Sequence, residues 1–147
     1  IKSYLAADRK SFDSALKLKI SQGLLDRFKV SDLVDAPAVV HYGDAFQQYL
    51  DRQYVVKQDF VKFSIRLFYK GQLFETMIDR LLETDQGWII IQNSGFAGEQ
   101  KKLKSKALSD LGDWCFLCRL GVKEVFQTEE VRSFVHFVMK GVVLEIL

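Results

Sequence analysis

Proline, cysteine and histidine are scarce in this chain, whose 147 residues include one Pro, two Cys and two His. Two cysteines are too few for the disulfide framework of a small secreted domain, and no secretory signal or membrane-spanning apolar run is visible. A reducing, cytoplasmic setting without membrane partners is therefore expected. The chain also lacks a G-x-x-x-x-G-K-[ST] loop, so it has no P-loop for binding ATP.

Neither sign of charge dominates, because the formal net charge is only +2. Bulk charge therefore does not predict nucleic-acid binding, and any DNA affinity must come from a local basic patch. The composition, 48% apolar and 27% charged, fits one globular domain over residues 1–147. The chain begins at Ile1 without Met, which favours a fragment of a longer protein.

The apolar pattern divides this domain into a helical part, residues 1–54, and a strand-rich core, residues 55–147. Apolar residues recur at helical spacing over residues 1–28, and Ser31-Asp32 is a candidate N-cap. Pro37 ends the short helical turn that follows Ser31-Asp32, and a second helix is expected from Ala38 to Tyr54.

The core begins with three predicted strands, near residues 57–69, 72–84 and 88–93, joined by turns at Gly71 and Gly87. The run Trp88-Ile89-Ile90-Ile91 is typical of a strand buried on both faces. A helix is then expected from Lys101 to about Leu120, with Gly121 as its stop. Residues 131–139 and 142–147 predict two further strands. The expected fold class is α/β, a mixed sheet of about five strands flanked by helices.

The centre of the chain resembles a known family. It reads MIDRL at 77–81 and DQGWIII at 85–91, followed by QNSG at 92–95. These segments resemble the PD-(D/E)XK nuclease domain at the C-terminus of RecB- and AddA-type helicase-nucleases of the UvrD/Rep superfamily. The family pattern there is approximately G-x-I-D-R-L, then D-G-W-x-I-x-D-Y-K-T. The resemblance covers about residues 55–147 and implies a restriction-endonuclease-like fold.

The resemblance also implies where the catalytic residues would stand. Asp79 matches the first acid, whereas Gln92 and Ser94 occupy the positions of the second acid and the lysine. Two carboxylates hold Mg²⁺, and the lysine positions or activates the nucleophile. A single carboxylate holds Mg²⁺ weakly, so no metal site or cofactor is expected. The supporting Y-x-x-Q-L-x-x-Y helix pattern is also degenerate, with Ala107, Asp110, Leu111 and Trp114 at its positions.

Four lysines after the third strand, Lys101, Lys102, Lys104 and Lys106, are the candidate DNA contacts, with a solvated helix start as the alternative. Cys115 and Cys118 form a C-x-x-C inside an apolar helix and are expected to pack in the core. His41 and His136 have no carboxylates at ligand spacing and are interpreted as structural or surface residues.

The sequence thus predicts a catalytically degenerate nuclease-like domain of a bacterial ATP-dependent helicase/exonuclease. It would contribute DNA binding, to single strands, or structural support in DNA repair and recombination. Its partner would be the helicase portion of the same chain or another helicase-nuclease subunit. One alternative is an active Mg²⁺-dependent exonuclease with a migrated site that uses Glu75 or Glu99. The other is a protein-binding scaffold without DNA contact, which would present no basic patch.

Overall fold

The computed structural model describes residues 36–147; the helix and N-cap predicted within residues 1–35 lie outside this range. The elements are helix α3 (Ala36–Gln53), strands β1 (Val56–Tyr69), β2 (Gln72–Thr84) and β3 (Gly87–Ser94), the short 3₁₀ turn η2 (Gln100–Lys102), helix α4 (Leu103–Phe126), and strands β4 (Val131–Phe137) and β5 (Val142–Glu145). The predicted bounds of α3 and the first three strands are confirmed to within two residues.

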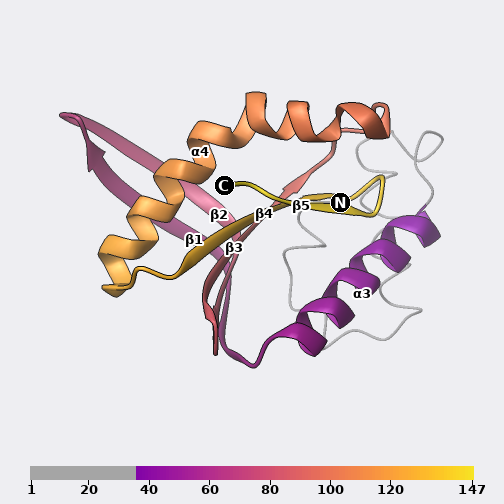
Figure 1. Cartoon of the computed structure of the whole chain (residues 1–147), viewed down its shortest axis with the longest axis horizontal. Helices are drawn as coiled ribbons and strands as arrows, with labels where there is room; N and C mark the ends of the chain where they lie inside the picture. The colour runs from indigo at the N-terminus through magenta and orange to yellow at the C-terminus, as the bar shows by residue number, and fades with distance from the viewer. Residues whose placement is uncertain (1–35) are drawn as a thin grey trace.

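The five strands form one mixed sheet in the order β1-β2-β3-β4-β5. The first three strands are an antiparallel meander, β3 and β4 run parallel, and β5 returns antiparallel to β4. A parallel pair cannot be joined by a tight turn, so the chain crosses between β3 and β4 through α4. This arrangement, visible in Figure 1, confirms an α/β fold with a five-stranded mixed sheet.

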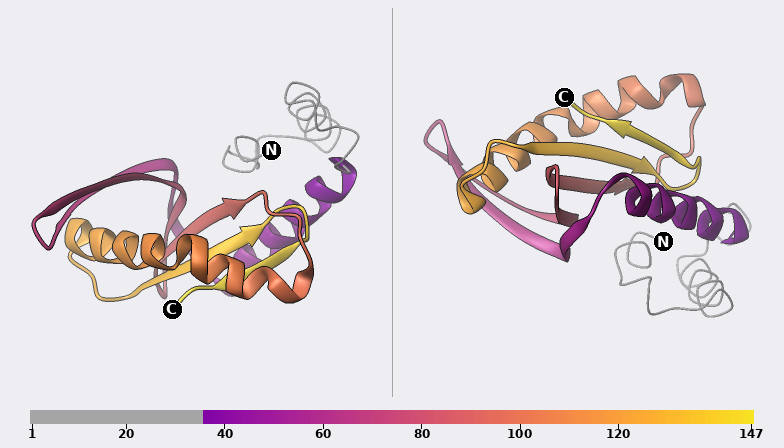
Figure 2. Two further views of the ribbon diagram at one scale, coloured as in Figure 1. Left: turned by 90° about the horizontal axis from the view of Figure 1, so that it is seen from above. Right: turned by 60° about the horizontal axis from the view of Figure 1, so that its bottom comes forward.

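The helices cover opposite faces of the sheet, as the two views of Figure 2 also show. Phe46 and Leu50 of α3 pack against Ile89 and Ile91, whereas α4 covers the face that carries Ile90. Residues 88–91 are therefore buried from both sides, as their unbroken apolar pattern predicted. Gly87, at φ +105°, supplies the turn before β3 that most side chains disfavour.

Helix α4 is longer than predicted, because Gly121 does not end it. Gly121 is buried within the helix, where a Cβ would lie 2.6 Å from Cγ1 of Ile65. The glycine instead lets α4 approach β1 closely, and the helix ends at Phe126, before Gln127 in a left-handed conformation at φ 52°. Residues 122–126 are thus helical, and the last two strands are shorter than predicted.

In strands β1 and β2 the regular alternation of side chains between the two faces of the sheet is interrupted at Lys62 and Asp79. These residues lie between the pairs Val61–Arg80 and Phe63–Ile78. Phe60 and Phe63 pack on the same side, with ring centroids 5.3 Å apart, although residues three apart in a regular strand face opposite sides. Lys62 has a φ of 60°, which rotates the backbone between these two rings. Ile78 and Leu81 of β2 likewise share one cluster. The phase change aligns Phe60 and Phe63 with the alternating pattern of Ile65 and Leu67, which continues to Tyr69 as predicted.

Candidate functional site

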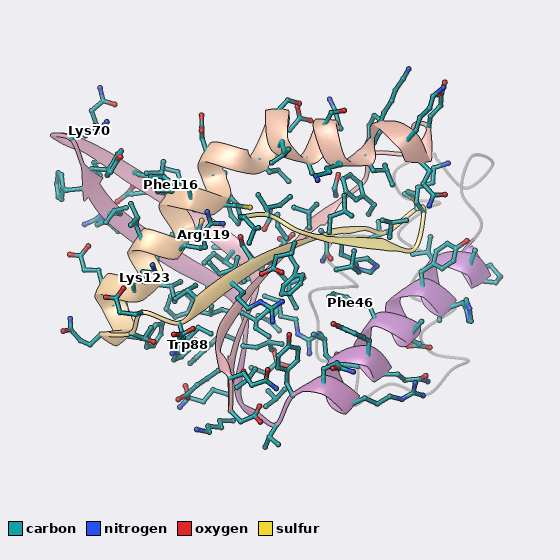
Figure 3. The ribbon with its side chains drawn as sticks, viewed as in Figure 1. Phe46, Lys70, Trp88, Phe116, Arg119 and Lys123 are labelled. Atoms are coloured by element: carbon teal, nitrogen blue, oxygen red, sulfur yellow. The ribbon has the colours of Figure 1, made fainter. Side chains whose placement is uncertain are left out.

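Asp79 stands where β2 and β3 separate. Their pairing runs from the Thr84–Gly87 end to Arg80 opposite Ile91 and stops there. Beyond this point the β1–β2 hairpin continues away from the sheet to its tip near Lys70, as Figure 3 shows. Asp79 as a whole is 5% exposed, and its carboxylate accepts a hydrogen bond from the backbone of β3 where the ladder between β2 and β3 has ended.

Both oxygens of this carboxylate have partners in the protein. Oδ1 accepts a hydrogen bond and ion pair from the Lys62 ammonium at 2.9 Å, and Oδ2 accepts from the backbone N–H of Asn93 at 3.0 Å. The backbone N–H of Asp79 donates to Oε1 of Gln92 at 3.2 Å. Asp79 thus links β1, β2 and β3, which satisfies the need of a buried carboxylate for partners.

The sequence did not indicate Lys62 as the partner of Asp79. The neighbouring residue Arg80 is not the partner, because it binds Asp59 through two hydrogen bonds of 3.0 and 2.7 Å. Lys62 is 17 residues from Asp79, and only the antiparallel register brings them together. Consecutive residues such as Asp79 and Arg80 point apart in a strand, which is the one local signal against Arg80.

Gln92 and Ser94 line a small cavity of about 200 Å³ between the end of β3 and the first turns of α4. The helix contributes Lys106, Ala107, Asp110 and Leu111, and Asn93 and Phe137 complete the lining. Lys106 binds Asp110 at 2.8 Å, and this hydrogen bond holds the pKa of the Asp110 carboxyl below its usual value. Three of the four helix positions taken from the resemblance, Ala107, Asp110 and Leu111, line the cavity with Gln92 and Ser94. The fourth, Trp114, instead donates a hydrogen bond from Nε1 to Oγ1 of Thr76 at 2.9 Å.

The four candidate DNA-contacting lysines lie at the start of α4, on η2 and its continuation. Lys101, Lys102 and Lys104 are exposed, and Lys106 is half-buried at the cavity. Lys101 and Lys102 lie 3.1 and 3.8 Å from the carboxylate of Glu99. The patch is therefore exposed but partly neutralised by a neighbouring acid.

The two acids proposed for a migrated site do not approach Asp79 with free carboxylates. Glu75 pairs with Arg66 across the β1–β2 hairpin, and Glu99 pairs with the lysines of η2. Among residues 36–147, no three His, Cys, Asp or Glu side chains form a group that could hold a metal ion.

Cys115 and Cys118 are free thiols, both fully buried in α4, as their apolar sequence context predicted. Burial raises the pKa of both thiols above the ordinary value. A hydrogen bond with Ser133 opposes this shift at Cys115, and the positive charge of Arg119 opposes it at both thiols. His136 is buried against Phe46, whereas His41 is exposed on α3. Both histidines thus have the structural or surface positions expected of them.

Comparison with known proteins adds no family to these observations: no family model matches the chain, and no curated protein matches it. Neither α3 nor α4, the two α-helices of residues 36–147, is long and apolar enough to cross a membrane. The chemistry of the site must therefore follow from its own residues.

Proposed function

We propose that this chain is a nuclease-like domain that has lost catalysis and binds single-stranded DNA within a bacterial helicase-nuclease. Its fold is proposed to be of the PD-(D/E)XK type, and its setting the cytoplasm, in DNA repair and recombination. The helicase portion of the same chain or a partner subunit supplies the ATP-driven motor. The domain itself contributes DNA contacts or structural support and needs no cofactor.

The order of elements supports the fold assignment. The resemblance implied a meander of three strands, a helix, and then further strands, which is the sequence β1-β2-β3-α4-β4-β5. Asp79 and Gln92 occupy neighbouring positions on adjacent strands, in contact through the 3.2 Å hydrogen bond. Ala107, Asp110 and Leu111, three of the four positions aligned to the family helix, line one cavity with Gln92 and Ser94, which supports the alignment.

The observation that carries the loss of catalysis is the ion pair between Lys62 and Asp79. Mg²⁺ prefers carboxylate oxygens as ligands, and a catalytic metal in this family needs two acids. Here one acid position is the neutral Gln92, whose oxygen accepts from the Asp79 backbone. The remaining carboxylate already has an ammonium at 2.9 Å on one oxygen and a backbone N–H on the other. A metal would have to displace Lys62 and would gain only one charged ligand.

The exposed lysines at the start of α4 support DNA binding over a scaffold role. Lys101, Lys102 and Lys104 are exposed on η2 and at the start of α4, the elements that follow β3 in the chain. A DNA strand bound there would contact these lysines with its phosphates, and their contribution to binding would weaken with salt. Lysines at a helix start oppose the helix dipole, so folding stability does not account for them.

The test is cleavage and binding of labelled single-stranded DNA by the full chain. We expect no cleavage with Mg²⁺ or Mn²⁺, by either the wild type or Asp79→Ala. Cleavage that disappears in Asp79→Ala would instead establish the active alternative.

Binding is then measured across a salt series for two triple variants of equal charge. One replaces Lys101, Lys102 and Lys104 by Ala, and the control replaces Lys57, Lys70 and Lys123. Loss of three phosphate contacts is expected to reduce the slope of log K against log salt by about 2 in the first variant only. Equal effects in both variants, or no DNA binding by the wild type, would refute the DNA-contact proposal and favour the scaffold.

A further inference from the structure

A second cavity, of about 430 Å³, lies on the other face of the sheet, between α3 and the β4–β5 hairpin. We name it the aromatic pocket and define it by its lining: Tyr42, Ala45, Phe46, Tyr49, Phe134, His136, Gly141 and Val143. Figure 3 shows Phe46 on the side of α3 that faces the sheet. None of these residues belongs to the site at Asp79.

Two periodicities produce the aromatic walls. Tyr42, Phe46 and Tyr49 are four and three residues apart, so they share one face of α3. Phe134 and His136 are two apart and share one face of β4. The two faces oppose each other, and the centroids of the Phe46 and His136 rings are 4.8 Å apart. Five aromatic rings from distant segments therefore surround one space.

The pocket is open to solvent on one side, and its volume is within the range of small-molecule sites, about 300–1,000 Å³. Gly141 contributes to its wall at φ +64°, and a Cβ there would lie 2.4 Å from Cδ1 of Tyr42. The turn thus places backbone, without a side chain, directly against the Tyr42 ring.

The chemistry of the walls selects for a flat, polar-edged ligand. Aromatic faces attract another π-system in offset or edge-on arrangements, and the Tyr42 and Tyr49 hydroxyls can hydrogen-bond its edge. The Arg132 guanidinium lies 5.1 Å from the Phe134 ring and is held by Glu145 through two hydrogen bonds, which fixes that wall. We infer that the aromatic pocket binds a planar heteroaromatic ring, specifically a nucleobase.

The nucleobase has two possible sources, a free nucleotide or a base of a single strand. The pocket lies on the face of the sheet that α3 covers, whereas the lysines belong to η2 and α4, which lie on the opposite face. Binding in the pocket is therefore independent of phosphate contacts at those lysines, and either can be absent without the other.

The experiment titrates the full chain with AMP and with TMP, and separately with eight-nucleotide dA and dT strands. The resonances of the tyrosine rings are followed by NMR, and affinities by calorimetry. The blocking variant is Ala45→Trp, since Ala45 is exposed at the pocket and a Trp there fills it without removing a wall. Gln48→Trp, exposed on the same helix outside the lining, is the matched control.

We expect saturable shifts of Tyr42 and Tyr49 with at least one ligand, and a loss of affinity in Ala45→Trp but not Gln48→Trp. Tyr49→Ala, which removes a half-exposed ring, should weaken binding by about fivefold or more, the effect of losing one stacked base. Equal affinity for mononucleotide and oligonucleotide would identify a free nucleotide as the source. Tighter binding of the oligonucleotide that is lost in Ala45→Trp would identify a strand.

Absence of any shift in either tyrosine would overturn the inference. So would contacts between these rings and side chains of residues 1–35 that persist at saturating ligand, because the pocket would then be filled by the chain itself. Affinities for both the mononucleotides and the oligonucleotides that are unchanged in Ala45→Trp would also overturn it, and strand binding that is lost only in the Lys101, Lys102 and Lys104 variant would then leave the proposed function intact.

Discussion

The ion pair between Lys62 and Asp79 gives the sharpest test of how this sheet is held together. We predict that Lys62→Met lowers the free energy of unfolding, since methionine keeps the apolar stem but removes the ammonium 2.9 Å from the carboxylate. Asp79 stays buried, with an exposed side-chain fraction of 7%, and retains only the Asn93 N–H as a partner. A buried carboxylate deprived of a charged partner is destabilising.

The size of the loss follows from the exposure of the two groups. A hydrogen bond to a charged group contributes roughly 1.5–3 kcal/mol. The Lys62 side chain is 41% exposed, so water can partly replace its ammonium, and the expected loss is about 1–2 kcal/mol. The φ of 60° at Lys62 costs further energy that Met would share. Lys62→Gly should relieve that strain and thus partly offset the lost ion pair.

The assay is urea unfolding of a double-mutant cycle with Lys62→Met and Asp79→Asn, which isolates the pair energy. A matched cycle with Arg66→Met and Glu75→Gln tests an ion pair across the same two strands, but exposed, at 71% and 50%. We expect a coupling of about 1–2 kcal/mol for the first cycle and below about 0.5 for the second. Equal couplings would refute the argument that burial of Asp79 makes its partner important.

Two further predictions concern α4 and the last strand. Gly112→Ala, at an open position of α4, should stabilise the protein by about 1 kcal/mol through helix propensity. Gly121→Ala should have a free energy of unfolding about 1–3 kcal/mol lower than that control, because its Cβ meets Ile65. Equal melting temperatures for the two variants would contradict the close approach of α4 to β1. The hydrogen bonds from Arg132 lower the pKa of Glu145 below its ordinary 4.5, so the pair stabilises the fold above that pH and this contribution is lost as the pH falls through the lowered value. Glu145→Gln should therefore flatten the acid side of the stability curve measured by thermal unfolding between pH 7 and 3, and an unchanged curve relative to the exposed Glu124→Gln control would contradict this.

The candidate site shows how far sequence reasoning reached. Asp79 is flanked by Ile78 and lies in a strand pattern, so its burial and its need for a partner were predictable. The partner itself was not predictable, because the antiparallel register of β1 and β2 determines which residue lies beside Asp79. The sequence around Lys62 also has no residue, such as glycine, that would signal the positive φ found there. Lys106 was predicted only as a DNA contact, whereas the crossover of α4 also brings it to the cavity at Gln92.

Sequence alone determined the α/β class and the bounds of α3, β1, β2 and β3. Turn glycines, period-two alternation and the apolar run at 88–91 are local signals, since they depend on each residue's own backbone and immediate neighbours. Tertiary structure decided the rest. Gly121 is the same residue type that ends helices, and only the approach of Ile65 makes it a packing residue. The aromatic pocket likewise joins α3 to the turn at Gly141, segments about a hundred residues apart, which only the folded sheet brings together.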